Sequence, residues 1–351
     1  MASIDRPLAA SSIALDSRAA VRAWLIVMAA LVFAMVLVGG ATRLTESGLS
    51  ITQWKPVTGV LPPLSAAEWR AEFERYKQIP QYSEMNSDMT LSGFKSIFWW
   101  EWSHRLLARI VGATFILPAL WFWFTGQFKG ALGRQVLVAT ALLALEPIVG
   151  WWMVSSGLSV RTEVAQERLA VHLLIAAGTF GALIYAAVGL SPRRRTDAPR
   201  AFAASAAAFA ALVYCQLGLG ALVAGLRAGM IYNTWPLMGD RLLPREAFPS
   251  PWPLAVLNDP TTAQFMHRSL GYAVLFFALV QALAGLRSGV PALGRRAAVL
   301  AGVALLQVAL GVTTLLLIVP IPLALAHQAT ALVLFGLAVA HWKATRMESG
   351  R

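Results

Sequence analysis

The sequence FWWEWSHRLLARIVGATFILPALWFWF, residues 98–124, joins a cluster of ionisable residues to a long apolar stretch. Residues 106–124 are long and apolar enough to cross a bilayer, for which a helix needs about 20 such residues. Glu101, His104 and Arg105 stand where this helix would enter the membrane. Ionisable groups at such places are costly and are usually functional. This stretch therefore predicts a membrane protein with a site at the membrane boundary.

The composition of the whole chain agrees with a membrane protein. Of its 351 residues 58% are hydrophobic and 13% are charged, whereas soluble domains have about 25% charged residues. The net charge of +12 lies in short segments between apolar runs, so it indicates topology, and we expect no nucleic-acid partner. The single cysteine, Cys215, excludes a disulfide within the chain and a cysteine metal cluster.

The apolar runs predict eight spanning helices. The charge-free segment 297–342 is too long for one helix, and the sequence VPIP at residues 319–322 divides it because proline cannot continue the helical hydrogen bonds. The predicted spans are residues 23–41, 106–124, 135–154, 169–190, 201–226, 265–286, 297–319 and 323–342.

Basic residues in the short loops predict the orientation. SPRRRTDAPR at residues 191–200 and the arginines Arg287, Arg295 and Arg296 mark loops that stay in the cytoplasm. Both termini are then cytoplasmic, and the long segments 42–102 and 227–264 face outward. Within the first of these segments, residues 65–78 predict a short amphipathic helix capped by Ser65. We expect a multi-pass protein of the cell inner (plasma) membrane.

The chain also repeats itself. SHRLLARIVGA from residue 103 resembles MHRSLGYAVLF from residue 266, each after a long outer loop. The predicted fold is all-α, with eight transmembrane helices as two pseudo-symmetric four-helix bundles in a parallel repeat. No helix is visibly interrupted at mid-membrane, which leaves a transporter as a distant alternative. The predicted parts are a cytoplasmic tail (1–22), a first half (23–190), a cytoplasmic linker (191–200), a second half (201–342) and a cytoplasmic tail (343–351).

Four of the five histidines follow one rule. They lie in the first turns of the even-numbered predicted helices, near the outer face, with two in each half: His104, His172, His267 and His327. Two imidazoles facing each other across a bundle can hold a metalloporphyrin. Zinc is the alternative, but it needs three or four ligands in one place. The fifth, His341, has no counterpart in the other half and is interpreted as interfacial.

The residues around the histidines differ between the halves. Arg105 and Arg268 can bind haem propionates in bidentate fashion or can simply lie at the membrane interface. Glu101 precedes His104 by one helical turn, whereas Gln264 occupies the matching place in the second half. This asymmetry favours an enzyme with one reactive and one accessory haem. The alternative is that Glu101 pairs with a nearby arginine.

Five motifs of the chain together resemble those of a known family. GGATRLTESGLSITQWKPVTGVLPPL, FKSIFWWEWSHR, GWWMVSSGL, YNTWPLM and QFMHR together resemble haem A synthase, from about Gly39 to His327. The resemblance implies haem O as substrate, haem b as cofactor and oxidation of the C8 methyl of haem O to a formyl group for cytochrome oxidase. It implies that His267 and His327 ligate the haem b iron. It also implies that His104 and His172 border the substrate site, as candidate ligands of its iron, and that Glu101 is catalytic.

With the histidines assigned in this way, their neighbours Arg105 and Arg268 are expected to bind the substrate haem and a haem b propionate, respectively. Expected partners are a haem O synthase (protohaem farnesyltransferase), an electron acceptor or donor protein and the lipid membrane, and a homo-oligomer is a further candidate. The chain lacks outer-loop cysteine pairs, as in the proteobacterial and mitochondrial branch. It departs from the family pattern at Gly93, Glu146, Pro147 and Glu167. A di-haem b-type electron-transfer protein remains the alternative function.

Overall fold

The computed structural model describes residues 6–191 and 198–346, and in these ranges the chain forms helices and no β-strand. Parts of the predicted tails and linker, residues 1–5, 192–197 and 347–351, lie outside them. Eight of the described helices are long and apolar enough to cross a membrane, as predicted. They are α1 (Arg6–Leu44), α4 (Leu91–Phe124), α5 (Gly130–Ser155), α6 (Gln166–Gly189), α7 (Arg200–Gly225), α9 (Pro260–Arg287), α10 (Pro291–Leu316) and α11 (Ile321–Arg346).

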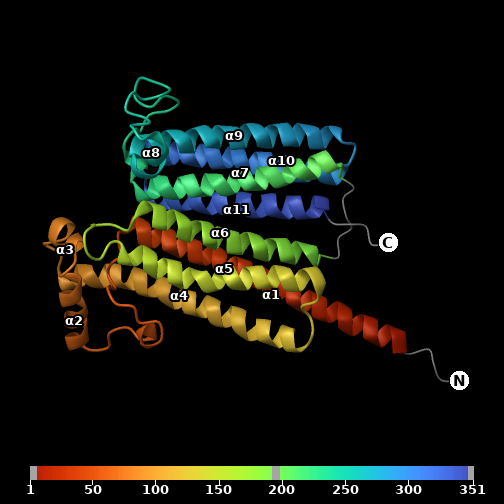
Figure 1. Cartoon of the computed structure of the whole chain (residues 1–351), viewed down its shortest axis with the longest axis horizontal. Coiled ribbons are helices and arrows are strands. Elements are labelled where there is room, and N and C mark those ends of the chain that lie inside the picture. The colour runs from red at the N-terminus through yellow and green to blue at the C-terminus, as the bar shows by residue number, and fades with distance from the viewer. Residues whose placement is uncertain (1–5, 192–197, 347–351) are drawn as a thin grey trace.

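Short helices gather at one end of the spanning helices, on the left of Figure 1. They are η1 (Thr58–Val60), α2 (Ala66–Tyr76), α3 (Pro80–Met85), η2 (Ala228–Met230) and α8 (Trp252–Asn258). The predicted amphipathic helix is α2, and Ser65 caps it in a reciprocal capping box with Glu68. Its buried face carries Trp69, Phe73 and Tyr76, and burial raises the pKa of the Tyr76 phenol above its usual value.

Helix α4 begins at Leu91, and the predicted start of this helix at residue 106 is wrong. The backbone N–H of Gly93 donates to the side chain of Thr90, which caps the helix. The additional turns are stabilised by aromatic packing, with Phe94 stacked on Phe73 of α2 at 5.1 Å between ring centres. His104 therefore lies about 20 Å along α4 rather than in its first turns.

The break between α10 and α11 is confirmed. Helix α10 ends at Leu316 and α11 begins at Ile321. Ile318 and Val319 take the left-handed conformation, with φ of 61° and 55°. The backbone N–H of Val319 donates to the Thr314 carbonyl at 2.8 Å, which satisfies the end of α10. The chain can therefore turn back at once into the next spanning helix.

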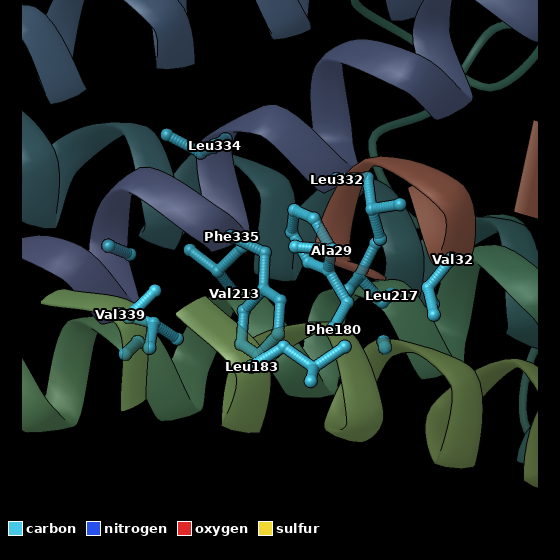
Figure 2. Packing of buried hydrophobic residues seen from close by; sticks show 14 of the residues in the cluster. Ala29, Val32, Phe180, Leu183, Val213, Leu217, Leu332, Leu334, Phe335 and Val339 are labelled. Carbon is cyan, nitrogen blue, oxygen red and sulfur yellow. The ribbon is translucent and has the colours of Figure 1, made fainter. Parts of the chain in front are cut away.

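Helices α6 and α11 pack against each other at the centre of the molecule (Figures 1 and 2). A Cβ atom at Gly181 would lie 2.9 Å from the ring of Phe335, and one at Gly336 would lie 2.8 Å from the ring of Phe180. These two reciprocal contacts are what a two-fold repeat would produce. However, α6 also packs on α7, and α11 also packs on α1. The division into two four-helix bundles therefore remains a prediction.

Candidate functional site

The structure brings His267 of α9 and His327 of α11 together. Their ring centres are 6.3 Å apart, with an angle of 75° between the planes. Two imidazoles on opposite sides of one metal, each with a bond of about 2 Å, have ring centres about 6 Å apart. This pair therefore fits a metalloporphyrin. No comparable ring contact joins His104 and His172 in the part of the chain that the structure describes.

Each of the four histidines lies against a glycine on the preceding spanning helix. A Cβ atom at Gly311 would clash with the imidazole, and one at the other three glycines would make a tight contact that shifts the ring by a few tenths of an ångström. The pairs, with the shortest distance from such a Cβ to the ring, are Gly39 and His104 (3.1 Å), Gly150 and His172 (3.2 Å), Gly220 and His267 (3.3 Å), and Gly311 and His327 (2.8 Å).

Three of these glycines have a polar residue four positions earlier, on the same helix face. Each polar side chain reaches the imidazole that lies against its glycine. The pairs are Glu146 Oε2 with His172 Nδ1 (2.8 Å), Gln216 Nε2 with His267 Nδ1 (3.1 Å), and Gln307 Nε2 with His327 Nε2 (3.3 Å). These partners were not predicted from the sequence, although the repeated spacing of Glu or Gln before Gly is a usable signal. The fourth position is occupied by Met35.

The second-half pair is surrounded by polar atoms that need a partner. Gln216 Oε1, Gln307 Oε1 and His327 Nδ1 are buried without a hydrogen bond among the described residues. Such an atom costs about 1–3 kcal/mol when it is left unsatisfied, so this region suits a bound group with polar or metal character. The described residues hold no cluster of three or more His, Cys, Asp or Glu side chains that could bind a metal ion, as zinc would require.

Glu101 lies in the N-terminal part of α4 and is only 3% exposed. Its carboxylate accepts hydrogen bonds from the Ser50 hydroxyl (2.8 Å), the Ile51 backbone N–H (2.7 Å) and Arg105 (2.6 Å). Arg105 also donates to the carbonyls of Ile51 and Gln53. Glu101 therefore does pair with an arginine, and the two residues together attach the loop of residues 50–53 to α4.

The second half repeats this arrangement without the carboxylate. Arg268 donates to the carbonyls of Tyr232 (2.8 Å) and Thr234 (3.0 Å). The amide of Gln264 also donates to the Tyr232 carbonyl, at 3.0 Å. Both Arg105 and Arg268 thus hold loop carbonyls in this structure, and their assignment to haem propionates stays a prediction.

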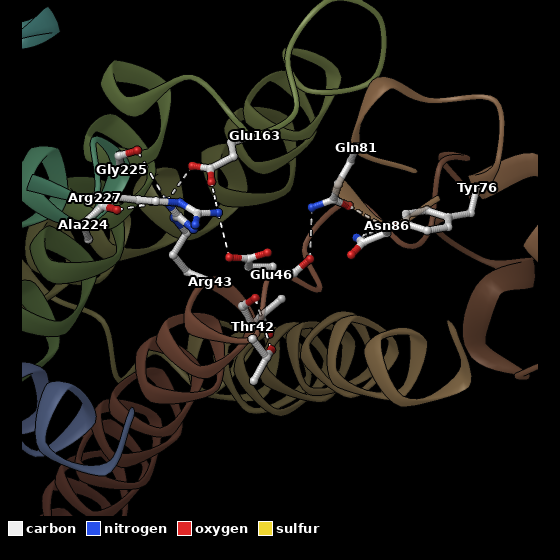
Figure 3. A network of polar contacts seen from close by, with 11 residues as sticks. Thr42, Arg43, Glu46, Tyr76, Gln81, Asn86, Glu163, Ala224, Gly225 and Arg227 are labelled. Atoms are coloured by element: carbon white, nitrogen blue, oxygen red, sulfur yellow. Dashed lines mark hydrogen bonds and ion pairs between the residues drawn. The ribbon is translucent and has the colours of Figure 1, made fainter. Parts of the chain in front are cut away.

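A charged network joins segments that are far apart in the chain (Figure 3). Arg43, in the last turn of α1, donates to Glu163 at 2.8 Å and to the Ala224 carbonyl at 3.0 Å. Arg227, directly after α7, pairs with Glu163 and with Glu46. No pattern in the sequence indicates that these residues, far apart in the chain, would meet. The network fixes the end of α7 against the loop before α6.

Comparison with known proteins identifies the family. The family model COX15-CtaA, described as cytochrome oxidase assembly protein, matches residues 22–339. A protein of Rhodopseudomonas palustris (strain BisA53) named "Heme A synthase" is 51% identical over 323 residues, covering 91% of this chain and 89% of the relative. The "Heme A synthase" of Mesorhizobium japonicum is 47% identical over 347 residues, 98% of this chain and 95% of the relative. The chain therefore belongs to the COX15-CtaA family of cytochrome oxidase assembly proteins, together with these haem A synthases.

Proposed function

We propose that this protein is a haem A synthase that oxidises the C8 methyl of haem O to a formyl group, giving haem A for cytochrome oxidase. The observation that carries the proposal is the similarity to proteins named "Heme A synthase", 51% identical over about nine tenths of both chains. The asymmetry between Glu101 and Gln264 supports it, because two equivalent electron-carrying haems would not need a carboxylate at one site only.

The second half is proposed to hold haem b, with His267 and His327 as its axial ligands. The ring separation of 6.3 Å and the unsatisfied amide oxygens of Gln216 and Gln307 support this choice. When bound, haem b would supply one-electron transfer to or from the substrate site. The protein orients the two imidazoles through these glutamines, as outer-shell partners do for metal-ligating histidines, and Arg268 is the candidate for a propionate.

The first half is proposed to hold haem O, with His104 and His172 as candidate ligands of the substrate iron and Arg105 beside them. Oxidation of the methyl group removes electrons and protons from the carbon, so positive charge and acidity develop there. A buried carboxylate can stabilise that charge or accept a proton. Glu101 is the group proposed for this role, held in place by Ser50, Ile51 and Arg105.

The membrane placement follows from the charge of the loops. We place the protein in the inner membrane with both termini in the cytoplasm and the haem sites near the periplasmic face. The long segments 42–102 and 227–264, which carry the arginine-bound loops, then lie outside. The proposed partners are the haem O synthase that supplies the substrate and a protein that exchanges electrons; a homo-oligomer is compatible with this arrangement.

The proposal is tested by extracting pigment from membranes that contain this protein together with a source of haem O. We expect haem A to appear in extracts analysed by reversed-phase chromatography. A di-haem electron carrier, the alternative function, would leave haem O unchanged and yield haem b only. Membranes that contain the haem O source without this protein are the control.

A further inference from the structure

We propose that Glu146 is a positioning residue for His172. Its carboxylate orients the imidazole at the substrate site and places a negative charge beside it. The proposal rests on the proposed function, because it takes His172 to be a ligand of the haem O iron. Glu146 Oε2 lies 2.8 Å from His172 Nδ1, and the side chains of both residues are about one fifth exposed. His172 Nδ1 is buried with no hydrogen bond among the described residues, so the nearby carboxylate is the acceptor available to an Nδ1–H. That tautomer leaves Nε2 without a proton and able to bind iron.

Helix α5 contacts the imidazole of His172 at two places. Glu146 and Gly150 are four residues apart on α5, on the same face. Glu146 Oε2 contacts Nδ1, and Gly150 lies against the Cε1 edge of the ring, where an added Cβ would stand at 3.2 Å. The second carboxylate oxygen, Oε1, is buried without a hydrogen bond among the described residues. The contact of Oε2 with the imidazole is therefore the polar contact of this carboxylate.

The side chain that contacts His172 differs in charge from those that contact His267 and His327. The equivalent positions for His267 and His327 carry the amides of Gln216 and Gln307. An amide can donate or accept, so it suits either tautomer, whereas a carboxylate only accepts and selects the Nδ1–H form. In a low-dielectric region a carboxylate also makes the imidazole a stronger electron donor. His172 is thus the only one of these three imidazoles with a charged partner.

The first test measures the tautomer in the haem-free protein. Nitrogen-15 labelling of histidine gives few signals, and the His172→Ala variant identifies the one from His172. We expect the Nδ1–H form in the parent protein and in Glu146→Gln, whose amide oxygen can still accept, and a mixture of forms in Glu146→Leu. An Nε2–H form in the parent protein, or an unchanged signal in Glu146→Leu, would overturn the proposal.

The second test measures haem O binding in a His267→Ala background, which leaves only the first site. We expect Glu146→Leu to weaken binding by about 10- to 100-fold, the usual effect of losing such a partner. Glu146→Gln should keep most of the affinity but raise the reduction potential of the bound iron, since the charge is gone. The matched control is Glu167→Gln, which removes a carboxylate five residues from His172 on the same helix.

The outcomes separate this proposal from the proposed function. If Glu146→Gln leaves the reduction potential unchanged, or if Glu167→Gln weakens binding as much as Glu146→Leu, the role of Glu146 is wrong. If instead the parent protein forms no haem A while the tautomer responds to Glu146 as expected, the proposed function fails and the contact between Glu146 and His172 stands.

Discussion

At the scale of single residues, the four histidines at matching places in the sequence have different neighbours. His267 and His327 have amide partners and form a ring contact, whereas His172 has a carboxylate partner. His104 has neither in its equivalent position, because Met35 stands there. The four histidines therefore share a glycine neighbour on the preceding spanning helix, and they differ in the side chain one turn before that glycine.

The second-half pair predicts a specific loss of pigment. Replacing His267 or His327 with Ala removes one axial ligand, so the low-spin haem b absorption should disappear or change strongly in the purified protein. The measurement is the reduced-minus-oxidised visible spectrum. His341→Ala, a buried histidine outside the two pairs, is the control and should keep the spectrum. A normal low-spin spectrum in both ligand variants would contradict the assignment.

Glu101 predicts a loss of turnover without loss of haem b. Glu101→Gln keeps the volume but removes the charge, and general acid–base groups typically contribute about 100- to 10,000-fold to a rate. We expect haem O or a partly oxidised product to accumulate, as measured by chromatography of extracted pigment. Ser50→Ala is the comparison, since it removes one hydrogen bond to Glu101 (2.8 Å) and keeps the carboxylate; its loss should stay below about tenfold. Parent-like turnover in Glu101→Gln would rule out a catalytic role.

At the scale of helices, the glycines determine how closely a neighbouring helix can bring its histidine. A Cβ at Gly311 would lie 2.8 Å from His327 Cε1, so Gly311→Ala should displace the ring and lower haem b content. Gly302→Ala is a matched control on the same helix, because nothing lies within 4 Å of a Cβ there. It should keep haem b and gain up to about 1 kcal/mol of helix stability. Equal haem content in the two variants, measured per mole of protein, would contradict this account.

The helices also show where sequence patterns succeed. Hydrophobic length locates all eight spans, because the cost of exposing polar groups to lipid adds up residue by residue along the segment. The start of α4 was misplaced because its first turns, from Leu91, are stabilised by aromatic rings of α2. That contact joins residues about 20 positions apart, and no pattern within the span announces it.

At the scale of the whole molecule, the charged network around Arg43 joins α1, the loop before α6 and the end of α7. Arg43→Ala removes a guanidinium that is 17% exposed and bonds to Glu163 and two carbonyls. We expect a loss of about 1–3 kcal/mol, seen as a lower midpoint of thermal unfolding in detergent. Arg241→Ala is the control, since its pair with Asp240 is longer (3.9 Å) and more exposed, and such pairs contribute about 0–1 kcal/mol. Equal midpoints would show that the network does not join these segments.

The orientation of the whole chain is tested with reporters. A reporter that is active only in the periplasm should be silent when fused after Arg351, because the basic loops place that end in the cytoplasm. The same reporter inserted after Leu242, which is 73% exposed in the outer loop, should be active. Activity at Arg351 and silence at Leu242 would invert the topology and move the haem sites to the cytoplasmic face.

The sequence by itself determined the membrane class, the eight spans, the break before α11 and the placement of His172, His267 and His327 near the starts of their helices. These follow from composition and from spacing along one segment, which are local quantities. The tertiary structure alone decided that Glu101 binds Ser50 and Ile51, that Glu146 reaches His172, and that Arg43 meets Glu163. Such contacts depend on how each helix is rotated about its axis and how far it is shifted against its neighbours. Many packed side chains set that rotation together, so it cannot be obtained from one stretch of sequence.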